Sequence, residues 1–356
     1  MIMNRHVKIR IAKVVAILVF VFAGLYFFRL TQDMKNGALH VTNAGVDNST
    51  CGNRDNPCRS ISQAIANAKT GDTIEVGPGR YGDLNRNGMF GEPGEELAKD
   101  LGMIDVDKPV TLISSDGPFM TVLDADGASL SAVSITANDV VFGQPKHGFL
   151  IVGAKANGLS TATISNVTVA GNIALANGQG GLVVNGNANL LHGNFASGNL
   201  AAGIAVFGSE NEVRNNIANS NGSEGFVIVG AKHLIRNNGA GNNATGFGIQ
   251  GTDIRFLRNA ALGNKFFGIS VATQGTSATI SQSNIYGNNN VPLNDLTNCG
   301  IQNLSGSTII ATGNFWGMSS GPGADPADNA GSGSGCDVEG SNTTVVPFAS
   351  ELFNLK

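Results

Sequence analysis

The chain has 356 residues, and 13% of them are charged, against about a quarter in typical soluble domains. A formal net charge of −4 gives no reason to expect a nucleic-acid partner. The 49 glycines and the many asparagines recur periodically, which indicates regular β-turns in one elongated domain, because a disordered segment would not keep a period.

The N-terminus has the features of an export signal. A basic tail at 1–13, expected in the cytoplasm, precedes an apolar segment at 14–30. No convincing cleavage site follows, and the segment approaches the ~20 residues that span a bilayer. We expect a signal anchor in the cell membrane with the body outside, or a secreted protein if the segment is cleaved as a signal peptide. A polar stem follows at 31–45.

Residues 46–320 are expected to form one repeat region. At its start, residues 61–68 have the apolar spacing of a helix, which predicts a short cap over the exposed edge of the first strands. Residues 71–81 then read as turn, strand and turn.

Six asparagine pairs, each with four residues between its members, dominate the next part of the chain. Both members advance by 22, 22, 22, 21 and 25 residues, and a period of about 22 is a solenoid signature. The pairs are Asn172 with Asn177, Asn194 with Asn199, Asn216 with Asn221, Asn238 with Asn243, Asn259 with Asn264, and Asn284 with Asn289. We interpret them as structural turns and stacked amide ladders, since asparagine tolerates the left-handed conformation.

Short alternating runs recur with the same period and predict strands. Large apolar residues are expected inward, with the residue between them outward. The inward positions are Leu182, Ile204, Phe226, Phe247 and Ile269; Val184, Val206, Ile228, Ile249 and Val271; and Leu191, Val213, Ile235 and Leu257. With no helical stretch between strands, the chain is predicted to be all-β, a right-handed parallel β-helix with asparagine ladders. Leucine-rich and hexapeptide patterns are absent.

The period breaks near residue 290, and a glycine-rich C-terminal cap is expected at 321–356. Phe315 and Trp316 are interpreted as a seal on the last coil, with sugar stacking as the alternative. The four cysteines predict two local disulfides, Cys51–Cys58 and Cys299–Cys336, in an oxidising compartment.

A candidate calcium loop lies between the first coils. Its predicted ligands provide oxygens at positions 1, 3 and 5 before a glycine, followed by two acids. These ligands are Asp83, Asn85, Asn87, Glu92 and Glu95. The acids stand at positions 10 and 13, whereas the pattern wants one at 12. The alternative is a surface loop without a metal, and a bound ion is expected to be structural.

A candidate polysaccharide-binding site follows one inward column. The residues directly after that column are basic, 22 residues apart, and expected to stack outward: His192, Arg214, Arg236 and Arg258. A row of guanidinium groups suits the carboxylates or sulfates of a polyanionic chain. The alternative is a solvated face on which Glu210, Glu212 or Asp253 pairs with these basic side chains.

The outward residues of the strands form a smooth strip that suits either the floor of a glycan groove or a surface for protein packing: Val183, Ala205, Val227, Gly248 and Ser270. Catalytic residues are not identified. Lys146 and His147 remain as an acid/base pair, and Glu210 with Glu212 as paired carboxylates.

Residues 71–81, the asparagine coils and the Asn314–Gly323 segment resemble exported right-handed parallel β-helix proteins of the pectate-lyase-like superfamily. The resemblance implies the fold and an association with polysaccharides, whereas the catalytic motifs of its lyases, hydrolases and epimerases are missing. We therefore expect a non-catalytic protein that binds an extended acidic polysaccharide at the cell envelope. A lyase or hydrolase with an atypical site and an adhesin or assembly component are the alternatives.

Overall fold

The computed structural model describes residues 38–87, 89–99, 101–128, 130–272, 275–289, 298–323, 327–331 and 335–355. The predicted cytoplasmic tail and signal anchor lie outside these residues, as does the first part of the stem, 31–37. Within the described ranges, no helix has the length and hydropathy that a membrane span requires.

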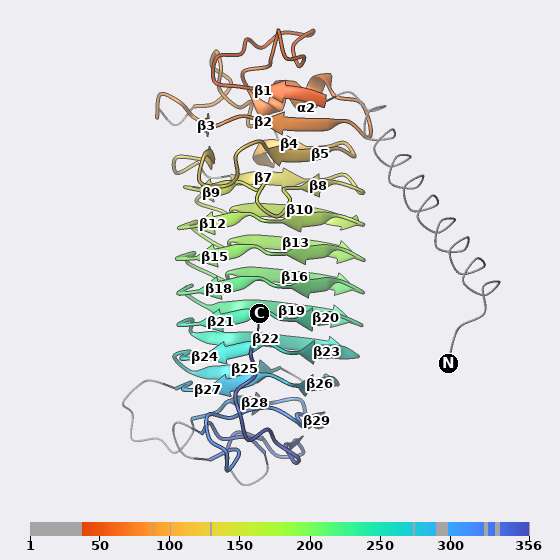
Figure 1. Ribbon diagram of the computed structural model, residues 1–356, viewed down its shortest axis with the longest axis vertical. Helices are drawn as coiled ribbons and strands as arrows, with labels where there is room; N and C mark the ends of the chain where they lie inside the picture. Colours follow the sequence, from red (N-terminus) through yellow and green to blue (C-terminus); the bar gives the residue numbers. More distant parts are fainter. Residues whose placement is uncertain are drawn as a thin grey trace, which may run out of the picture.

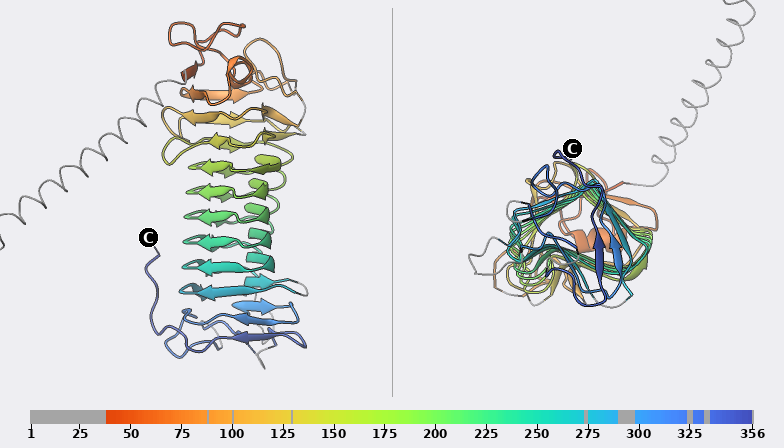
Figure 2. Two further views of the ribbon diagram at one scale, coloured as in Figure 1. Left: turned by 90° about the vertical axis from the view of Figure 1, so that its right-hand side faces the viewer. Right: turned by 90° about the horizontal axis from the view of Figure 1, so that it is seen from below.

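The chain winds into a solenoid with three flat sides (Figures 1 and 2). Every side is a sheet whose neighbouring strands come from successive coils and pair in parallel register. Coils of about 22 residues stack because no coil can bury its apolar side alone. The predicted all-β parallel solenoid is confirmed.

Sheet 1 has twelve strands among the described residues, and sheets 2 and 3 have nine each. Sheet 1 contains β1 (Ala38–Val41), β2 (Thr73–Val76), β5 (Thr111–Ser114), β8 (Val141–Phe142), β11 (Thr168–Ala170), β14 (Leu190–His192), β17 (Glu212–Arg214), β20 (Leu234–Arg236), β23 (Ile254–Leu257), β26 (Ala278–Ser281), β29 (Thr308–Ile310) and β30 (Asn342–Thr344). Sheet 2 contains β4 (Gly102–Val106), β7 (Ser131–Ile135), β10 (Leu159–Ser165), β13 (Leu182–Asn187), β16 (Ile204–Ser209), β19 (Glu224–Ala231), β22 (Thr245–Thr252), β25 (Phe267–Val271) and β28 (Ile301–Asn303). Sheet 3 contains β3 (Gly79–Gly82), β6 (Thr121–Asp124), β9 (Leu150–Val152), β12 (Ile173–Leu175), β15 (Phe195–Ser197), β18 (Ile217–Asn219), β21 (Gly239–Gly241), β24 (Ala260–Leu262) and β27 (Asn284–Tyr286).

The core is a stack of the predicted inward residues. Both inward columns of sheet 2 are fully buried, as are Leu191, Val213 and Ile235 of sheet 1. The fourth predicted member of the sheet 1 column is wrong, because Ile235 pairs with Phe256 and not with Leu257. This coil has 21 residues, so a strict period of 22 places the register one residue too late.

Two ladders of buried asparagines run along the solenoid at its turns. In each ladder the backbone N–H and the side-chain amide donate to Oδ1 of the next coil, as from Asn194 to Asn216 at 2.9 Å each. The amide also donates to a backbone carbonyl, as from Asn216 to Leu191 at 2.9 Å. The ladders therefore satisfy buried polar groups that the turns would otherwise leave unpaired.

Two details of the ladder prediction are wrong. The left-handed conformation belongs to the residue before each ladder asparagine, for example Asn215 and Asn237 with φ of 55° and 54°. The last predicted pair is also shifted, because Ser283 and Asn288 occupy the ladder positions and not Asn284 and Asn289. The coil is one residue shorter here than the sequence spacing suggests.

A third, shorter ladder was not predicted. Asn189 donates its backbone N–H to Asn211 Oδ1 at 2.8 Å, and the N–H of Asn211 donates to His233 Nδ1 at 3.3 Å. His233 Nε2 lies 3.3 Å from the carbonyl oxygen of Val229. Burial lowers the pKa of the His233 imidazole, although these backbone contacts oppose the shift. The ring is therefore neutral, with Nδ1 as the acceptor.

Exchanging His233 for asparagine, the residue that the two preceding coils carry, is expected to reduce the acid sensitivity of the fold. A histidine with a lowered folded-state pKa gives stability that is complete above about pH 6.5 and is lost as the pH falls through the folded pKa. The free energy of urea unfolding, measured from neutral pH to about pH 5, should fall less steeply for His233→Asn than for the natural chain. Equal slopes for the two proteins would show that His233 does not contribute to the acid sensitivity of the fold.

Both ends of the solenoid are closed. At the N-terminal end, helix α2 (Ile61–Asn67) covers the first coil, and Glu96 accepts hydrogen bonds from the backbone of Ile61 and Ser62 at 2.8 Å. At the other end Trp316 is fully buried, as expected of a seal and not of a sugar platform. The predicted disulfides Cys51–Cys58 and Cys299–Cys336 are both formed.

The C-terminal segment runs back along the outside of the solenoid (Figures 1 and 2). Ala349 donates its backbone N–H to Asn314 O, and Phe353 exchanges two hydrogen bonds with the side-chain amide of Asn284 at 3.0 and 2.9 Å. One coil further on, Arg258 Nη2 donates to Asn354 O at 3.2 Å. The segment therefore joins three successive coils.

Candidate functional site

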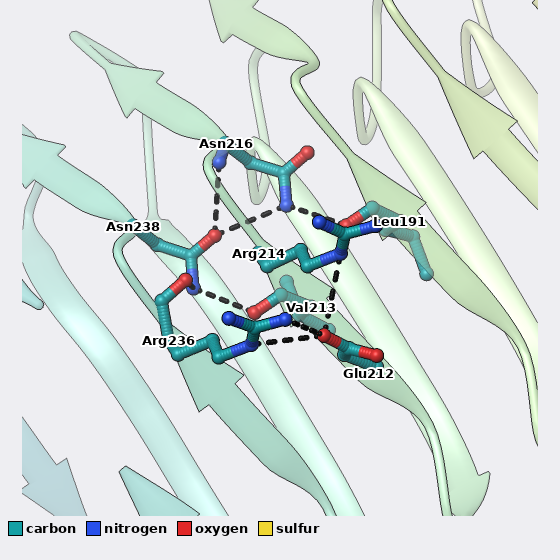
Figure 3. Close-up of polar contacts among 7 residues, drawn as sticks. All are labelled: Leu191, Glu212, Val213, Arg214, Asn216, Arg236 and Asn238. Atoms are coloured by element: carbon teal, nitrogen blue, oxygen red, sulfur yellow. Dashed lines mark hydrogen bonds and ion pairs between the residues drawn. The ribbon is translucent and has the colours of Figure 1, made fainter. Parts of the chain in front are cut away.

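The predicted basic column lies on the outer face of sheet 1, where His192, Arg214 and Arg236 stand in register on β14, β17 and β20. The carboxylate of Glu212 lies between the two arginines (Figure 3). Arg236 Nε and Nη2 both donate to Glu212 Oε1, at 2.9 and 2.7 Å. Arg214 Nε lies 3.3 Å from the same oxygen as an ion pair without hydrogen-bond geometry.

The electrostatics of this column are weaker than its residue types suggest. Burial, followed by the charge of Arg214, lowers the pKa of His192, so its imidazole is neutral at pH 7. Glu212 offsets one of the two guanidinium charges, which leaves a net charge of +1 for the three groups. Glu212 and both arginines therefore match the alternative interpretation, a solvated face on which acidic residues pair with the basic ones.

Arg258 does not belong to the column, contrary to the prediction. Leu257 takes the register position after Arg236, and Arg258 forms the following turn with φ of 55°. The cause is again the coil of 21 residues. Its guanidinium instead holds Asn354 of the C-terminal segment.

The other charged candidates lie on turns or at exposed positions. Glu210 lies at a turn and pairs with Lys232 at 3.4 Å, away from the contacts of Glu212. His147 is exposed, and its Nδ1 lies 3.0 Å from Ser114 O. Lys146 is an exposed turn residue with φ of 72°. We assign no proton transfer to these groups.

The predicted calcium loop lies between β3 and β4. Asp83 is fully buried and Glu95 is 4% exposed. Glu92 accepts hydrogen bonds from the side-chain amides of Asn85 and Asn87. The carboxylates of Asp83, Glu92 and Glu95 do not all lie within 4.8 Å of one another in the described chain. The one group that does contains Asp47 with Cys51 and Cys58, whose sulfurs are consumed by the disulfide.

A groove lies on the outer face of sheet 2, where the predicted smooth strip is found. Val183, Ala205 and Val227 stand in register on β13, β16 and β19 and form the floor of a hollow of about 300 Å³. Phe207 lies beside them, one outward position further along β16. The strip is therefore a concave apolar surface that crosses several coils.

Polar residues form the rim of this groove, and no repeat of the sequence indicates them. Gln179 and Ser223 lie on the turns that lead into the strands of sheet 2, and Glu224 is the first residue of β19. The Ser223 hydroxyl donates to the Glu224 carboxylate. An apolar floor with a few polar groups is typical of ligand sites. Alternation along each strand predicts the floor, whereas the rim depends on turns whose sequences do not repeat.

An exposed phenylalanine, Phe266, continues the rim two coils further. Backbone hydrogen bonds link Ser223 to Ala244 and Ala244 to Phe266, so these residues align along the axis. Phe266 is 43% exposed, and its ring centroid lies 6.4 Å from that of Phe267. Lys265 Nζ lies 5.2 Å from the Phe266 centroid. The consecutive phenylalanines at 266 and 267 interrupt the glycine-rich turn pattern, which is the signal that could have identified them.

Comparison with known proteins gives the following relationships. The family described as "Right handed beta helix region" matches residues 147–316, and "Protein of unknown function (DUF1565)" matches residues 43–90. No curated protein matches the sequence. The structure of pectate lyase Pel9A is similar at 18% identity and a TM-score of 0.50, over 88% of this chain and 78% of that one.

Two epimerase structures are also similar. The mannuronan C-5 epimerase AlgE6 A-module of Azotobacter vinelandii has 15% identity and a TM-score of 0.45, over 80% of this chain and 92% of that one. The periplasmic alginate epimerase AlgG has 10% identity and a TM-score of 0.40, over 80% and 70%. At its identity, the similarity to Pel9A establishes a shared fold and leaves the activity open.

Proposed function

We propose that this chain, a right-handed parallel β-helix of the pectate-lyase-like fold, binds an extended polysaccharide along the groove of sheet 2. The observation that carries the proposal is the concave apolar floor formed by Val183, Ala205 and Val227. A linear glycan has apolar ring faces and polar edges, so it can pack on this floor while its hydroxyl groups meet the polar rim.

The rim also supports a preference for acidic sugars. Phe266 offers an exposed ring on which a sugar face can pack, and the ammonium group of Lys265 stands beside that ring. A sugar carboxylate at this place would pair with Lys265. Arg214 and Arg236 provide a second, weaker cationic surface on sheet 1, because Glu212 offsets part of their charge.

We place the protein outside the cytoplasm, at the cell envelope. Two disulfides close loops at opposite ends of the solenoid, and such bonds persist in oxidising compartments. The apolar segment at 14–30 would act as a membrane anchor, or as a cleaved signal peptide if the protein is secreted.

A polysaccharide lyase or hydrolase is the second candidate, because the groove contains the carboxylate of Glu224. Hydrolysis normally requires two carboxylates flanking the scissile bond, and the residues lining the groove supply one. Incubation with acidic and neutral polysaccharides would distinguish the two functions. New reducing or unsaturated ends that increase with time, and that are lost in Glu224→Gln, would identify an enzyme and contradict a purely binding role.

Replacing Val227 by aspartate is expected to weaken polysaccharide retention by about tenfold or more, since it places a hydrated carboxylate on the apolar floor. Affinity electrophoresis with the polysaccharide panel measures this change. Ile217→Asp is the matched control, because Ile217 is a half-exposed apolar residue on sheet 3, away from the groove. Equal loss in both variants, or none in Val227→Asp, would reject the groove as the binding site.

A further inference from the structure

The loop between β3 and β4 buries three carboxylates. Asp83, Glu95 and Glu96 are 0%, 4% and 1% exposed. Glu96 is satisfied by the N-terminus of α2. The nearby Arg80 already pairs with Asp124 at 2.7 Å. Burying a carboxylate is costly unless a positive charge or several donors compensate it.

One oxygen of the Glu95 carboxylate has no hydrogen-bond partner among the described residues. Its Oε1 accepts from the backbone N–H groups of Leu84 and Asn85 at 2.9 and 3.3 Å, which places the carboxylate against the start of the loop. Its Oε2 is buried and has no hydrogen-bond partner among the described residues. None of the ion pairs in the described chain involves Glu95. A buried carboxylate oxygen with no partner is a ligand position for a cation.

The other oxygens come from the same loop, although the carboxylates of Asp83, Glu92 and Glu95 do not all lie within 4.8 Å of one another in the described chain. Asp83 Oδ1 is held by the backbone N–H of Arg86 at 2.7 Å, which orients the carboxylate within the loop. The amide groups of Asn85 and Asn87 both face Glu92. Asn85 Oδ1 accepts from the Asn87 backbone N–H at 2.9 Å and Asn87 Oδ1 from the Met89 backbone N–H at 2.8 Å, and each oxygen has a second lone pair that can coordinate an ion. All these ligand atoms are oxygens.

We propose that this loop binds one calcium ion through Asp83, Asn85, Asn87, Glu92 and Glu95. Calcium accepts six to eight oxygen ligands in flexible geometry, whereas magnesium requires a smaller octahedral site and retains its water. Binding draws Glu92, which lies on the outer side of the loop, toward the buried Glu95. Because Glu96 joins the same loop to α2, the ion ties the loop to the cap of the solenoid.

Calcium titration of the full-length chain, after treatment with a chelator, tests the proposal without any polysaccharide, so its result is independent of the proposed function. Calorimetry should show one ion per chain, and calcium should raise the midpoint of thermal unfolding. Magnesium at the same concentration should produce a smaller shift. Glu95→Gln and Glu92→Gln should each lower the calcium affinity by about tenfold or more. Asp55→Asn, an exposed acid at the same end of the molecule, should change it less than about twofold.

The two ligand variants separate calcium binding from ordinary loop stability. Glu95→Gln keeps an oxygen for Leu84 and Asn85, so its midpoint in chelator should equal or exceed that of the natural chain. If Glu95→Gln impairs folding, Glu92→Gln still tests the proposal. Glu92 is partly exposed, so its exchange for glutamine should leave folding intact. Absence of calcium binding up to about 10 mM, or unchanged affinity in the ligand variants, would overturn the proposal.

Discussion

Truncating Phe247 to alanine is expected to lower the free energy of unfolding by about 3–5 kcal/mol, because it opens a cavity in the core of the solenoid. The Phe247 ring is fully buried, stacks on Phe226 with centroids 4.7 Å apart, and meets Phe256 edge-on at 4.8 Å. These aromatic pairs add to the loss of buried area. Urea unfolding followed by circular dichroism measures the change.

Phe119→Ala is the matched control, since the Phe119 side chain is 81% exposed. Its effect should stay within about 0.5 kcal/mol. A similar loss in both variants would show that the three rings of the core are not a local source of stability.

The second large effect is expected for Asn216→Ala, which interrupts an asparagine ladder in its middle (Figure 3). The backbone N–H of Asn194 loses its acceptor and the carbonyl of Leu191 loses a donor, and both groups are buried. A stranded buried polar group costs about 1–3 kcal/mol, so a total loss of about 3–4 kcal/mol is expected. Urea unfolding again provides the measurement.

Two further variants test the explanation for this loss. Asn216→Ser should cost less, because Ser283 occupies the same ladder position naturally and accepts from Asn259 N at 3.0 Å. Asn219→Ala removes an asparagine with one exposed hydrogen bond from the same coil and should have a small effect. If serine is no better than alanine, the hydrogen bonds of the ladder are not the source of the stability.

The period of the sequence predicts the fold because each coil repeats the same physical problem. On sheet 2 an inward apolar residue must alternate with an outward one, and the turns must satisfy buried polar groups. Large apolar residues equivalent to Phe226 and asparagines equivalent to Asn216 therefore recur from coil to coil. The period fails where a coil changes length. The 21-residue coil between Ile235 and Phe256 shifts the register by one position, and Arg258 leaves the basic column for a turn.

The site was less predictable than the fold for a different reason. Stacked residue types indicate which side chains share a face, but the sequence does not say that Glu212 reaches between Arg214 and Arg236. Likewise, the groove rim is built by turns, and its aromatic member Phe266 occurs once. The His233 ladder was missed because it has few members and ends in a different residue type.

The C-terminal segment has a consequence for the order in which the coils come apart. A stack of nearest-neighbour units unravels most readily from its ends, where a coil has one neighbour. Here the final segment attaches to Asn314 and also to Asn284 and Arg258 on earlier coils. Opening the last coil therefore also requires releasing contacts on coils that are still closed. The C-terminal end of the solenoid is thus expected to unfold together with its neighbouring coils and not by itself.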